Sequence, residues 1–273
     1  MSELFKPGLD MLQPGADWRA AAPANVDVLF TCREGGVSSG PWGDENGVMG
    51  LNVGPHTGDF AACVKMNRQI VSQLVPSDPK WLKQVHGTRV VAAETVEGEP
   101  EADAAVSMTP GVVAVVMVAD CLPVMIADAE GRAVCAVHAG WRGLADGVVQ
   151  MGVKAVRDAV GDDDARIVVW LGPRIGPEAF EVGEDVREAM KANLPNADAA
   201  FREENGKLYA DLGMLAREAL GQMRVTDADI FDCGLSTHAD KKRFWSFRRD
   251  GEKAGRHAAM IWLKPEAAET AQA

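Results

Sequence analysis

The chain has 273 residues, 47% of them hydrophobic, which is enough to bury the core of one enzyme-sized domain. Its formal net charge of −12 argues against a general nucleic-acid-binding or acidic-membrane-binding protein, because both need a positive surface field. No apolar run approaches the roughly eighteen residues of a membrane span, and the first residues lack the basic and apolar regions of a signal peptide. We therefore expect a cytoplasmic protein with one domain over residues 1–273 and peripheral tails at 1–20 and 264–273.

The cysteines support the same compartment. There are five, widely spaced and without a Cys-x-x-Cys pair: Cys32, Cys63, Cys121, Cys135 and Cys233. An odd number without paired spacing does not make a disulfide framework, and a reducing compartment keeps such residues as thiols.

The N-terminal part is predicted to contain one strand, at residues 26–31, followed by loops. The Gly/Ser-rich segment 32–40 could present backbone amides to an anion, or could be a flexible surface connection. Residues 41–58 are Gly-rich and irregular, so a long loop is expected there.

One helix and one strand come next. Cys63, Met66, Ile70 and Leu74 recur at helical spacing, which predicts an amphipathic helix over residues 60–75 with Cys63 buried. His86 stands at the boundary of a strand expected at 89–93. The acidic segment 94–103 is predicted to be solvated.

Three apolar runs in the middle of the chain predict buried strands at residues 112–119, 122–127 and 133–137. Two side chains that can bind metals stand at their ends, Cys121 and His138. Because Pro123 cannot donate a backbone hydrogen bond, we expect Cys121 and Leu122 where the chain kinks and its pairing breaks. Polar side chains at such a break can face a cavity.

Strands and helices continue to alternate in the second half. Helices are expected at residues 144–155, 184–194 and 209–220, and strands at 167–171, 227–233 and 256–263. The first of these helices begins directly behind His138, and its N-terminal end would favour anions. A rigid loop at 172–177 and a basic, aromatic segment at 241–250 connect the other elements.

His86, Cys121 and His138 lie 35 and 17 residues apart, much farther than the close ligand pairs of a zinc finger. Three ligands from three strand ends, with one position open to water or substrate, are typical of a catalytic zinc site. From spacing alone, however, each of them could equally be a hydrogen-bonded or packed structural group. His56 is open to the same two interpretations, and His257, at the head of an apolar strand, is expected to be structural.

A family resemblance extends over nearly the whole chain. The matching segments, in order, are Thr31-Cys-Arg-Glu-Gly-Gly-Val-Ser-Ser-Gly40, Leu51-Asn-Val-Gly54, Gln84-Val-His-Gly87, Ala119-Asp-Cys-Leu-Pro-Val124, Val137-His-Ala-Gly-Trp-Arg-Gly143, Leu171-Gly-Pro-Arg-Ile-Gly-Pro177, Phe180-Glu-Val-Gly183 and Phe244-Trp-Ser-Phe-Arg-Arg-Asp-Gly251. They closely resemble the laccase-domain family, first described as multicopper polyphenol oxidases and later as purine nucleoside phosphorylases.

The resemblance implies a layered α/β/β/α sandwich with mixed sheets, and a zinc site at His86, Cys121 and His138. It also implies a transferase that acts on adenosine, inosine, guanosine and methylthioadenosine with phosphate, giving the base and ribose 1-phosphate. Adenosine deamination, a hydrolase reaction, is implied as a side activity. It would not use the base-deaminase arrangement, because the chain has neither the His-x-Glu nor the Pro-Cys-x-x-Cys motif.

Phosphate requires forked hydrogen-bond donors besides a metal. Five arginines lie in loops or segment ends of the matched motifs: Arg33, Arg142, Arg174, Arg248 and Arg249. We favour Arg33 and Arg248 as substrate-binding residues, together with Asn52 of the Leu51–Gly54 motif. For each arginine, a structural ion pair is the alternative.

Asp120 is the remaining candidate, because it adjoins Cys121. It could act as a general acid or base, or it could orient a ligand histidine, and we favour the orienting role. The expected partners are purine nucleosides and phosphate, without nucleic acid or membrane, and the expected state is a monomer.

Two other functions stay open. Two histidines and a cysteine near a thioether are also the donors of a blue-copper site, and Met117 and Met125 flank Cys121. A copper-dependent polyphenol oxidase is therefore the main alternative, but a multicopper centre needs more imidazoles than five histidines supply. A role in editing peptidoglycan precursors is attributed to some relatives, and no residue pattern here points to a muramyl ligand.

The chain departs from the family pattern in three places. Glu178-Ala179 stands where relatives commonly have a cysteine pair, so no thiol can act there. The loop between Gly40 and Leu51 is longer than usual. Ser236-Thr-His238 replaces a Cys-Thr-Tyr type sequence, and we expect His238 to be an idle surface residue.

Overall fold

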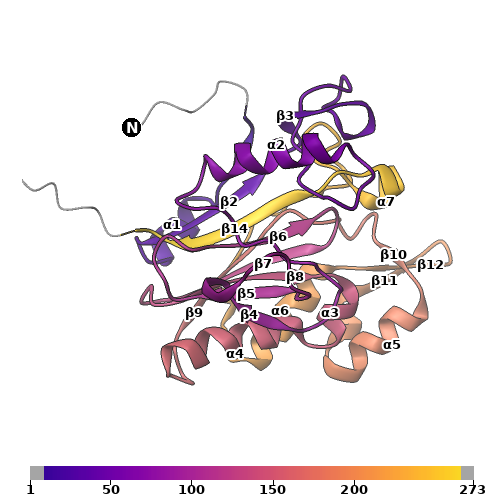
Figure 1. Cartoon of the computed structure of the whole chain (residues 1–273). Coiled ribbons are helices and arrows are strands. Elements are labelled where there is room, and N and C mark those ends of the chain that lie inside the picture. The colour runs from indigo at the N-terminus through magenta and orange to yellow at the C-terminus, as the bar shows by residue number, and fades with distance from the viewer. Residues whose placement is uncertain (1–8, 266–273) are drawn as a thin grey trace, which may run out of the picture.

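The computed structural model describes residues 9–265, and two β-sheets packed face to face form its centre (Figure 1). One is a four-stranded antiparallel sheet, and the other is a six-stranded mixed sheet. The first has the order β1 (Met11–Leu12), β2 (Val26–Thr31), β14 (His257–Leu263), β6 (Val113–Val118). The second has the order β13 (Ile230–Asp232), β9 (Ile167–Leu171), β7 (Leu122–Asp128), β8 (Val134–Ala139), β5 (Ala104–Ser107), β4 (Val90–Ala92). The strands expected near residues 26, 89, 112, 122, 133, 167, 227 and 256 are thus all present.

Between residues 9 and 265, seven α-helices and four shorter strands surround the sheets. The helices are α1 (Ala16–Ala21), α2 (Ala61–Ser72), α3 (Trp141–Ala145), α4 (Val148–Val160), α5 (Glu184–Asn193), α6 (Leu212–Gln222) and α7 (Phe247–Asp250). The strands are β3 (Glu34–Ser38), β10 (Glu181–Val182), β11 (Phe201–Glu204) and β12 (Lys207–Ala210), the last three of which form a small sheet of their own. Within the described part of the chain, no helix is long and apolar enough to cross a membrane.

Both large sheets are buried on both faces, which explains their continuous apolar runs. In β7, Met125 packs between the two sheets, whereas Val124 and Ile126 pack toward α4 and α6. In β6, Val116 faces the other sheet and Val115 faces the layer that contains α2. The layers are therefore α2, the four-stranded sheet, the six-stranded sheet, and α4 with α6 (Figure 1). The α/β/β/α sandwich is confirmed.

Pro123 does not break the pairing where we expected. Leu122 already pairs with Ala139, and Pro123 pairs with His138 at the first positions of β7. The break lies one step earlier, where the chain leaves the four-stranded sheet after β6 and enters the six-stranded sheet at β7. Asp120 makes that crossover with a positive φ of 84°.

The helix expected over residues 60–75 forms as α2, but its buried face was predicted wrongly. Val64, Asn67 and Val71 are buried, whereas Met66 is 48% exposed and Cys63 is only half-buried. Asn67 lies on the buried face because of its hydrogen bonds: its side-chain amide donates to the backbone carbonyls of residues 50 and 52 and accepts from the backbone amide of residue 37. A hydrophobic pattern cannot detect a buried face that is centred on an asparagine.

The same contacts order the Gly/Ser-rich segment that we expected to be a loop. Residues 34–38 form β3, whose Glu34 and Ser38 each bridge to Gly50. The amides of Gly35 and Gly36 donate to the Met49 carbonyl. Because these amides already have protein acceptors, they are not available to an anion.

The helix predicted over residues 209–220 begins later, at Leu212, because Tyr209 belongs to β12. Asp211 caps the helix: its carboxylate accepts from the amides of Gly213 (2.7 Å) and Met214 (3.1 Å). The helix expected at 184–194 is confirmed as α5, and the one expected at 144–155 is interrupted, because Gly147, with a φ of 96°, separates α3 from α4.

The N-terminal tail was expected to reach residue 20, but residues 9–20 contribute to the sandwich. Met11 and Leu12 pair with β2, and Trp18 of α1 is 3% exposed. The rest of the two expected tails, residues 1–8 and 266–273, lies outside the described residues.

His257, at the start of β14, is structural, as expected. It is fully buried, its Nδ1 donates to the Thr31 carbonyl (2.8 Å), and its Nε2 accepts from the Trp245 amide (2.9 Å). Since one nitrogen donates and the other accepts, the ring is neutral. Burial, the largest influence, lowers the pKa of His257 from 6.5 to about 3.

We expect His257 to make the free energy of unfolding depend on acidity. Below pH 6.5 the unfolded chain protonates this residue, whereas the folded protein keeps it neutral down to about pH 3. Stability should therefore fall with decreasing pH, at up to about 1.4 kcal/mol per pH unit from this residue. In the control variant His257→Gln, the amide offers one donor group and one acceptor but does not titrate. Urea denaturation of both proteins at several pH values should show a smaller slope for the variant, and equal slopes would contradict the assignment.

Candidate metal centre and its cavity

His86, Cys121 and His138 come together at one end of the two sheets. His86 lies in the loop before β4, Cys121 lies in the crossover between β6 and β7, and His138 lies in β8. Their ligand atoms all lie within 4.8 Å of one another, and His86 Nε2 is 3.9 Å from Cys121 Sγ. The two imidazole rings meet edge to face with their centroids 4.8 Å apart. Among the described residues, this is the one group of three or more such side chains that could hold a metal ion.

The group fits a zinc ion in its chemistry and nearly in its spacing. Tetrahedral zinc with nitrogen and sulfur ligands places neighbouring ligand atoms roughly 3.3–3.6 Å apart, so small side-chain movements would suffice. His138 is buried, Cys121 is half-buried and His86 is exposed, which leaves one side of the group open. Three protein ligands and an open side are the pattern of a catalytic site.

Close backbone approach is needed here, and Gly140 provides it. A Cβ atom at this position would lie 2.5 Å from the His86 ring and 3.2 Å from Cys121 Sγ. Any larger residue would push the ligands apart. This accounts physically for the glycine in the His138-Ala-Gly-Trp141 motif.

Asp103 holds two of the three ligands. Its carboxylate accepts from His138 Nδ1 (2.8 Å) and from the amides of Val85 (3.2 Å), His86 (2.9 Å) and Gly87 (2.8 Å). The His86 backbone has a φ of 59°, a left-handed conformation that is costly for a histidine, and the three amide bonds stabilise it. With Nδ1 donating to Asp103, His138 presents Nε2 as the free ligand atom.

The sequence reasoning missed Asp103. We expected residues 94–103 to be a solvated acidic segment, but Asp103 is fully buried. Glu94 is also used internally, because its carboxylate accepts from Ser107 and from the amides of Met108 and Thr109. An acidic stretch does not reveal which of its carboxylates has buried donors to accept from.

We had favoured a role for Asp120 in orienting a ligand histidine, but its carboxylate contacts neither of them. One of its oxygens accepts from Thr237 Oγ1 (2.6 Å), and the other accepts from Ser246 Oγ (2.9 Å) and the Arg248 amide (2.6 Å). These bonds tie the crossover at Asp120 to the segment 237–248 and stabilise its left-handed backbone. The carboxylate lies at the cavity wall beside Cys121, with both oxygens engaged by the protein.

The three ligands and Asp103 are electrostatically coupled. Burial alone would raise the pKa of Cys121, but the neighbouring histidines, above all His138, outweigh it and lower the pKa. Burial alone would lower the pKa of His138, but Cys121 and Asp103 raise it. Burial likewise opposes ionisation of Asp103, yet its hydrogen bonds, above all the one from His138, hold its pKa below the usual range. The thiol is therefore poised as a thiolate, the form that binds metals.

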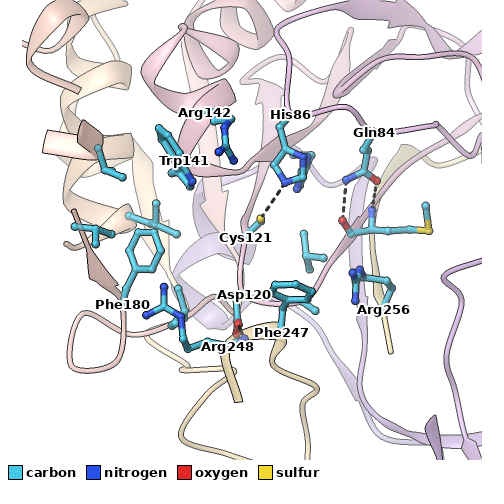
Figure 2. A pocket seen from close by; sticks show the side chains of 18 of the residues that line it. Gln84, His86, Asp120, Cys121, Trp141, Arg142, Phe180, Phe247, Arg248 and Arg256 are labelled. Atoms are coloured by element: carbon cyan, nitrogen blue, oxygen red, sulfur yellow. Dashed lines mark hydrogen bonds between the residues drawn. The ribbon is translucent and has the colours of Figure 1, made fainter. Parts of the chain in front are cut away.

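The open side of the metal group faces a cavity of about 490 Å³ (Figure 2). Twenty residues line it: His56, Gln84, His86, Met117, Val118, Ala119, Asp120, Cys121, His138, Trp141, Arg142, Ile175, Phe180, Glu181, Val182, Val186, Leu212, Phe247, Arg248 and Arg256. This volume lies within the usual range for small-molecule sites.

Three arginines line the cavity: Arg142, Arg248 and Arg256. Within residues 9–265, no carboxylate oxygen lies within 4.0 Å of their guanidinium nitrogens, whereas ten other arginines form such ion pairs. In a protein with a net charge of −12, cations without carboxylate partners around one cavity indicate an anion site.

Of the three expected substrate-binding residues, Arg248 lines the cavity, whereas Arg33 and Asn52 do not. Arg33 is 6% exposed and donates to the carbonyls of Gly43 (2.8 Å) and Lys241 (3.3 Å). The fully buried Asn52 joins Thr57, Asp59, Gly54 and Arg256. Both residues hold loops together.

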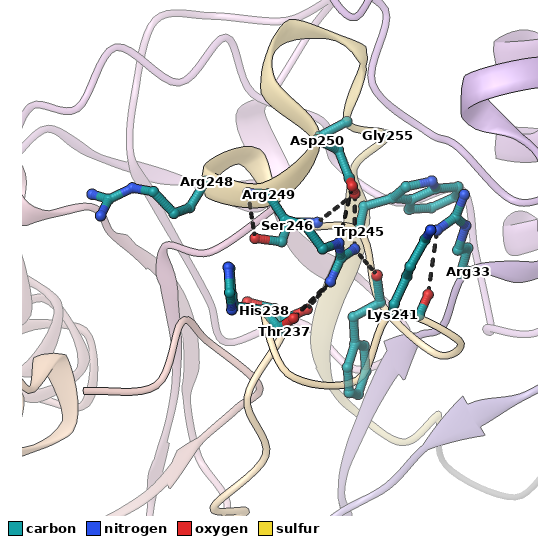
Figure 3. Close-up of polar contacts among 12 residues, drawn as sticks. Arg33, Thr237, His238, Lys241, Trp245, Ser246, Arg248, Arg249, Asp250 and Gly255 are labelled. Carbon is teal, nitrogen blue, oxygen red and sulfur yellow. Dashed lines mark hydrogen bonds and ion pairs between the residues drawn. The ribbon is translucent and has the colours of Figure 1, made fainter. Parts of the chain in front are cut away.

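Two further motif arginines, Arg249 and Arg174, are also structural. Arg249 binds Asp250 and the carbonyls of Thr237, His238 and Phe244, whereas Arg248 extends away from this cluster (Figure 3). Arg174 is paired with Asp232 through two hydrogen bonds of 2.8 Å. His56 and Arg256 were not predicted as substrate contacts, and no motif singled them out.

The domain is thus a mixed α/β sandwich with an open His-Cys-His group over a cavity, and this group could hold a metal ion. Residues 27–264 match the model of the family described as multi-copper polyphenol oxidoreductase laccase, and the chain belongs to this family. The resemblance based on the motifs is confirmed.

Relatives with similar sequences carry an enzyme name. A purine nucleoside phosphorylase of Pseudomonas aeruginosa is 42% identical over 250 residues, covering 91% of this chain and 97% of that protein. The purine nucleoside phosphorylase YfiH of Escherichia coli is 42% identical over 247 residues, covering 88% and 95%. Among solved structures, a Neisseria meningitidis protein matches with a TM-score of 0.81 and 41% identity, covering 93% of this chain and 99% of that one. YlmD from Geobacillus stearothermophilus matches with a TM-score of 0.81 and 26% identity, covering 92% and 94%.

Proposed function

We propose that the protein is a zinc-dependent purine nucleoside phosphorylase. The observation that carries the proposal is the open His86-Cys121-His138 group at a cavity with three arginines that have no carboxylate partner among residues 9–265. The names of the relatives support it. Its substrates would be adenosine, inosine, guanosine or methylthioadenosine, together with phosphate.

The residues of the chain suit both parts of such a substrate pair. Trp141 and Phe180 bring aromatic rings to the cavity wall for a purine, and the arginines bring positive charge for an oxyanion. Asp103 fixes His138 in the tautomer that leaves Nε2 free. A bound zinc ion would supply positive charge and Lewis acidity at the cavity floor. Adenosine deamination is proposed as the side activity of the same site.

The family description favours a second candidate, copper-dependent oxidation of phenols. The donor set can bind copper, but the thioethers that might complete a blue-copper site are engaged elsewhere. Met125 is fully buried between the sheets, and Met117 Sδ accepts from Arg68 Nη2 at 3.6 Å. The described residues also contain one His/Cys/carboxylate group rather than several, which does not favour a multicopper centre.

One assay distinguishes these activities. Purified protein of known metal content is incubated with adenosine, with and without phosphate, and adenine, inosine and ribose 1-phosphate are measured. We expect adenine and ribose 1-phosphate in equal amounts that depend on phosphate, with a smaller yield of inosine. Inosine as the main product in both conditions would make the protein a deaminase instead. Oxidation of a phenol with visible absorption of the copper-loaded protein would favour the second candidate.

A further inference from the structure

The cavity has two chemically different halves, one on each side of Cys121. In Figure 2, Trp141, Phe180 and Arg248 lie to one side, and Gln84 and Arg256 lie to the other. The first half is apolar, because Phe180 and its neighbours belong to the large cluster between the six-stranded sheet and α4, α5 and α6: Trp141, Ile175, Phe180, Val182, Val186 and Leu212. The second half is more polar: Gln84 and Arg256 line it together with Met117, whose backbone pairs with Gln84, and His56 is close enough for the charge of Arg256 to lower its pKa.

Arg256 is held in place by the protein but keeps free donors. Its Nη1 donates to the carbonyls of Ala254 (2.8 Å) and Gly255 (3.1 Å), and its backbone amide donates to Asn52 Oδ1 (2.9 Å). A Cβ at Gly54 would lie 2.5 Å from Arg256 Cγ, so this glycine makes room for the side chain. Within the described part of the chain, Nε and Nη2 donate to no protein acceptor. The guanidinium is therefore preorganised, which reduces the entropy cost of binding a ligand.

The charge of Arg256 is half-buried, and within residues 9–265 no carboxylate oxygen lies within 4.0 Å of it; the guanidinium carbon lies 5.8 Å from the centroid of the Phe247 ring. Burial is the largest influence on this side chain and lowers its pKa, with Cys121 and Asp120 as the opposing negative groups. Asp120 already accepts from Thr237, Ser246 and Arg248, and Cys121 belongs to the metal group. Since burying a charge is costly unless it is paired, a ligand anion is the missing partner.

His56 adds a neutral donor beside this arginine. Burial, followed by the positive charges of Arg256 and Arg68, lowers its pKa, so the ring is uncharged at neutral pH. Arg68 itself is occupied, because it pairs with Glu99 and lies over the Trp81 ring, 4.2 Å from the centroid.

The other two arginines are less suited to an oxyanion. Arg248 uses Nη1 and Nη2 on the carbonyls of Ala179 (3.1 Å) and Glu181 (2.9 Å), and its guanidinium lies 5.6 Å from the Phe180 ring centroid. Arg142 is exposed, lies over Trp141, and has no hydrogen bond to hold it within residues 9–265.

We propose that inorganic phosphate binds to Arg256 and His56, and that the purine base binds in the apolar half against Phe180. This assignment rests on the proposed phosphorylase function, and it places the ribose between the halves, beside the metal group. In the reaction, a phosphate oxygen bonds to ribose C1′ as the bond from C1′ to purine N9 breaks. The electron pair leaves with N9, which takes up a proton from solvent, so the products are free purine and ribose 1-phosphate.

The test is phosphate binding by isothermal titration calorimetry, together with the KM values for phosphate and nucleoside. Arg256→Gln removes the charge, Arg256→Lys keeps it, and the exposed Arg89→Gln is the control for loss of one charge. We expect Arg256→Gln to weaken phosphate binding about 10–100-fold with little change in the nucleoside KM, as for loss of a charged hydrogen bond. Arg256→Lys should lose less, and Arg89→Gln should match the wild type.

The outcomes separate this assignment from the proposed function. Phosphorolysis with an unchanged phosphate KM in Arg256→Gln would overturn the assignment and leave the phosphorylase function standing. If the wild type binds phosphate but catalyses no phosphorolysis, and Arg256→Gln loses the binding, the assignment would stand and the phosphorylase function would be refuted. The assignment also fails if the wild type binds no phosphate, or if Arg256→Lys and Arg256→Gln lose phosphate binding equally. It fails as well if Arg142→Gln or Arg248→Gln abolishes phosphate binding while Arg256→Gln does not.

Discussion

Replacing Cys121 by alanine is expected to abolish metal retention and phosphorolysis while leaving a folded protein. Cys121 lies in the crossover between the two sheets, half-buried at the cavity wall, so its loss removes little of the core. Protein zinc sites bind with about 10–16 kcal/mol from three or four ligands, so losing one ligand should weaken binding by at least about 100-fold. Metal content by mass spectrometry after gel filtration measures the effect, and urea denaturation checks the fold.

Cys63→Ala is the matched control, because Cys63 is also half-buried but lies on α2, away from the metal group. It should keep the wild-type metal content and activity. His138→Ala should also lose the metal, but it leaves the buried Asp103 without its histidine partner and is expected to lose stability as well. Unchanged metal content in both Cys121→Ala and His138→Ala would show that the site is assigned wrongly.

Replacing Asp103 by asparagine should weaken metal binding about 10–100-fold, although Asp103 would not touch the metal. Asparagine replaces one accepting oxygen of the carboxylate by an NH2 donor. This donor would face either His138 Nδ1–H or a backbone N–H of residues 85–87, and one hydrogen bond would be lost. If the His138 proton moves from Nδ1 to Nε2, Nε2 can no longer bind the metal. If an amide loses its acceptor instead, the left-handed turn at His86 is no longer held.

Competition with a chelator measures the metal affinity, and Glu101→Gln is the control. Glu101 is exposed, lies two residues away and pairs with Lys83 at 2.9 Å, so its loss should leave the affinity unchanged. A merely structural Asp103 would lower stability without changing the metal affinity of the folded protein. Wild-type affinity in Asp103→Asn would therefore refute its positioning role.

Much of the fold could be predicted because burial on both faces leaves a strong signal. The runs that became β6, β7, β8 and β9 are apolar at nearly every position, since each strand is covered by a layer on both sides. The short strands β10, β11 and β12 carry no such run and were missed. Residues 202–204 of β11 are charged and exposed, and in the four-residue β12 the two buried residues, Leu208 and Ala210, make too short a pattern to recognise.

The candidate site was predictable only in part. The spacing of His86, Cys121 and His138 left a metal group open, and the family resemblance of the long motifs that contain them implied it. The same motifs contain Arg33 and Asn52, which hold loops instead of lining the cavity. A motif does not distinguish a side chain that contacts a substrate from one that positions the backbone, because both depend on residue identity.

By itself, the sequence determined the buried strands through its apolar runs, and through its family motifs it implied the layered fold and the three side chains able to bind a metal. Only the tertiary structure decided which other polar groups serve the site. Asp103 positions two of the metal-binding residues because folding buries its carboxylate against His138 and the backbone amides of residues 85–87. Arg256 became an anion candidate because folding left it at the cavity with no carboxylate partner in the described part of the chain. The physical reason is that the role of a charged side chain depends on which partners lie within about 4 Å, and those partners come from distant parts of the chain.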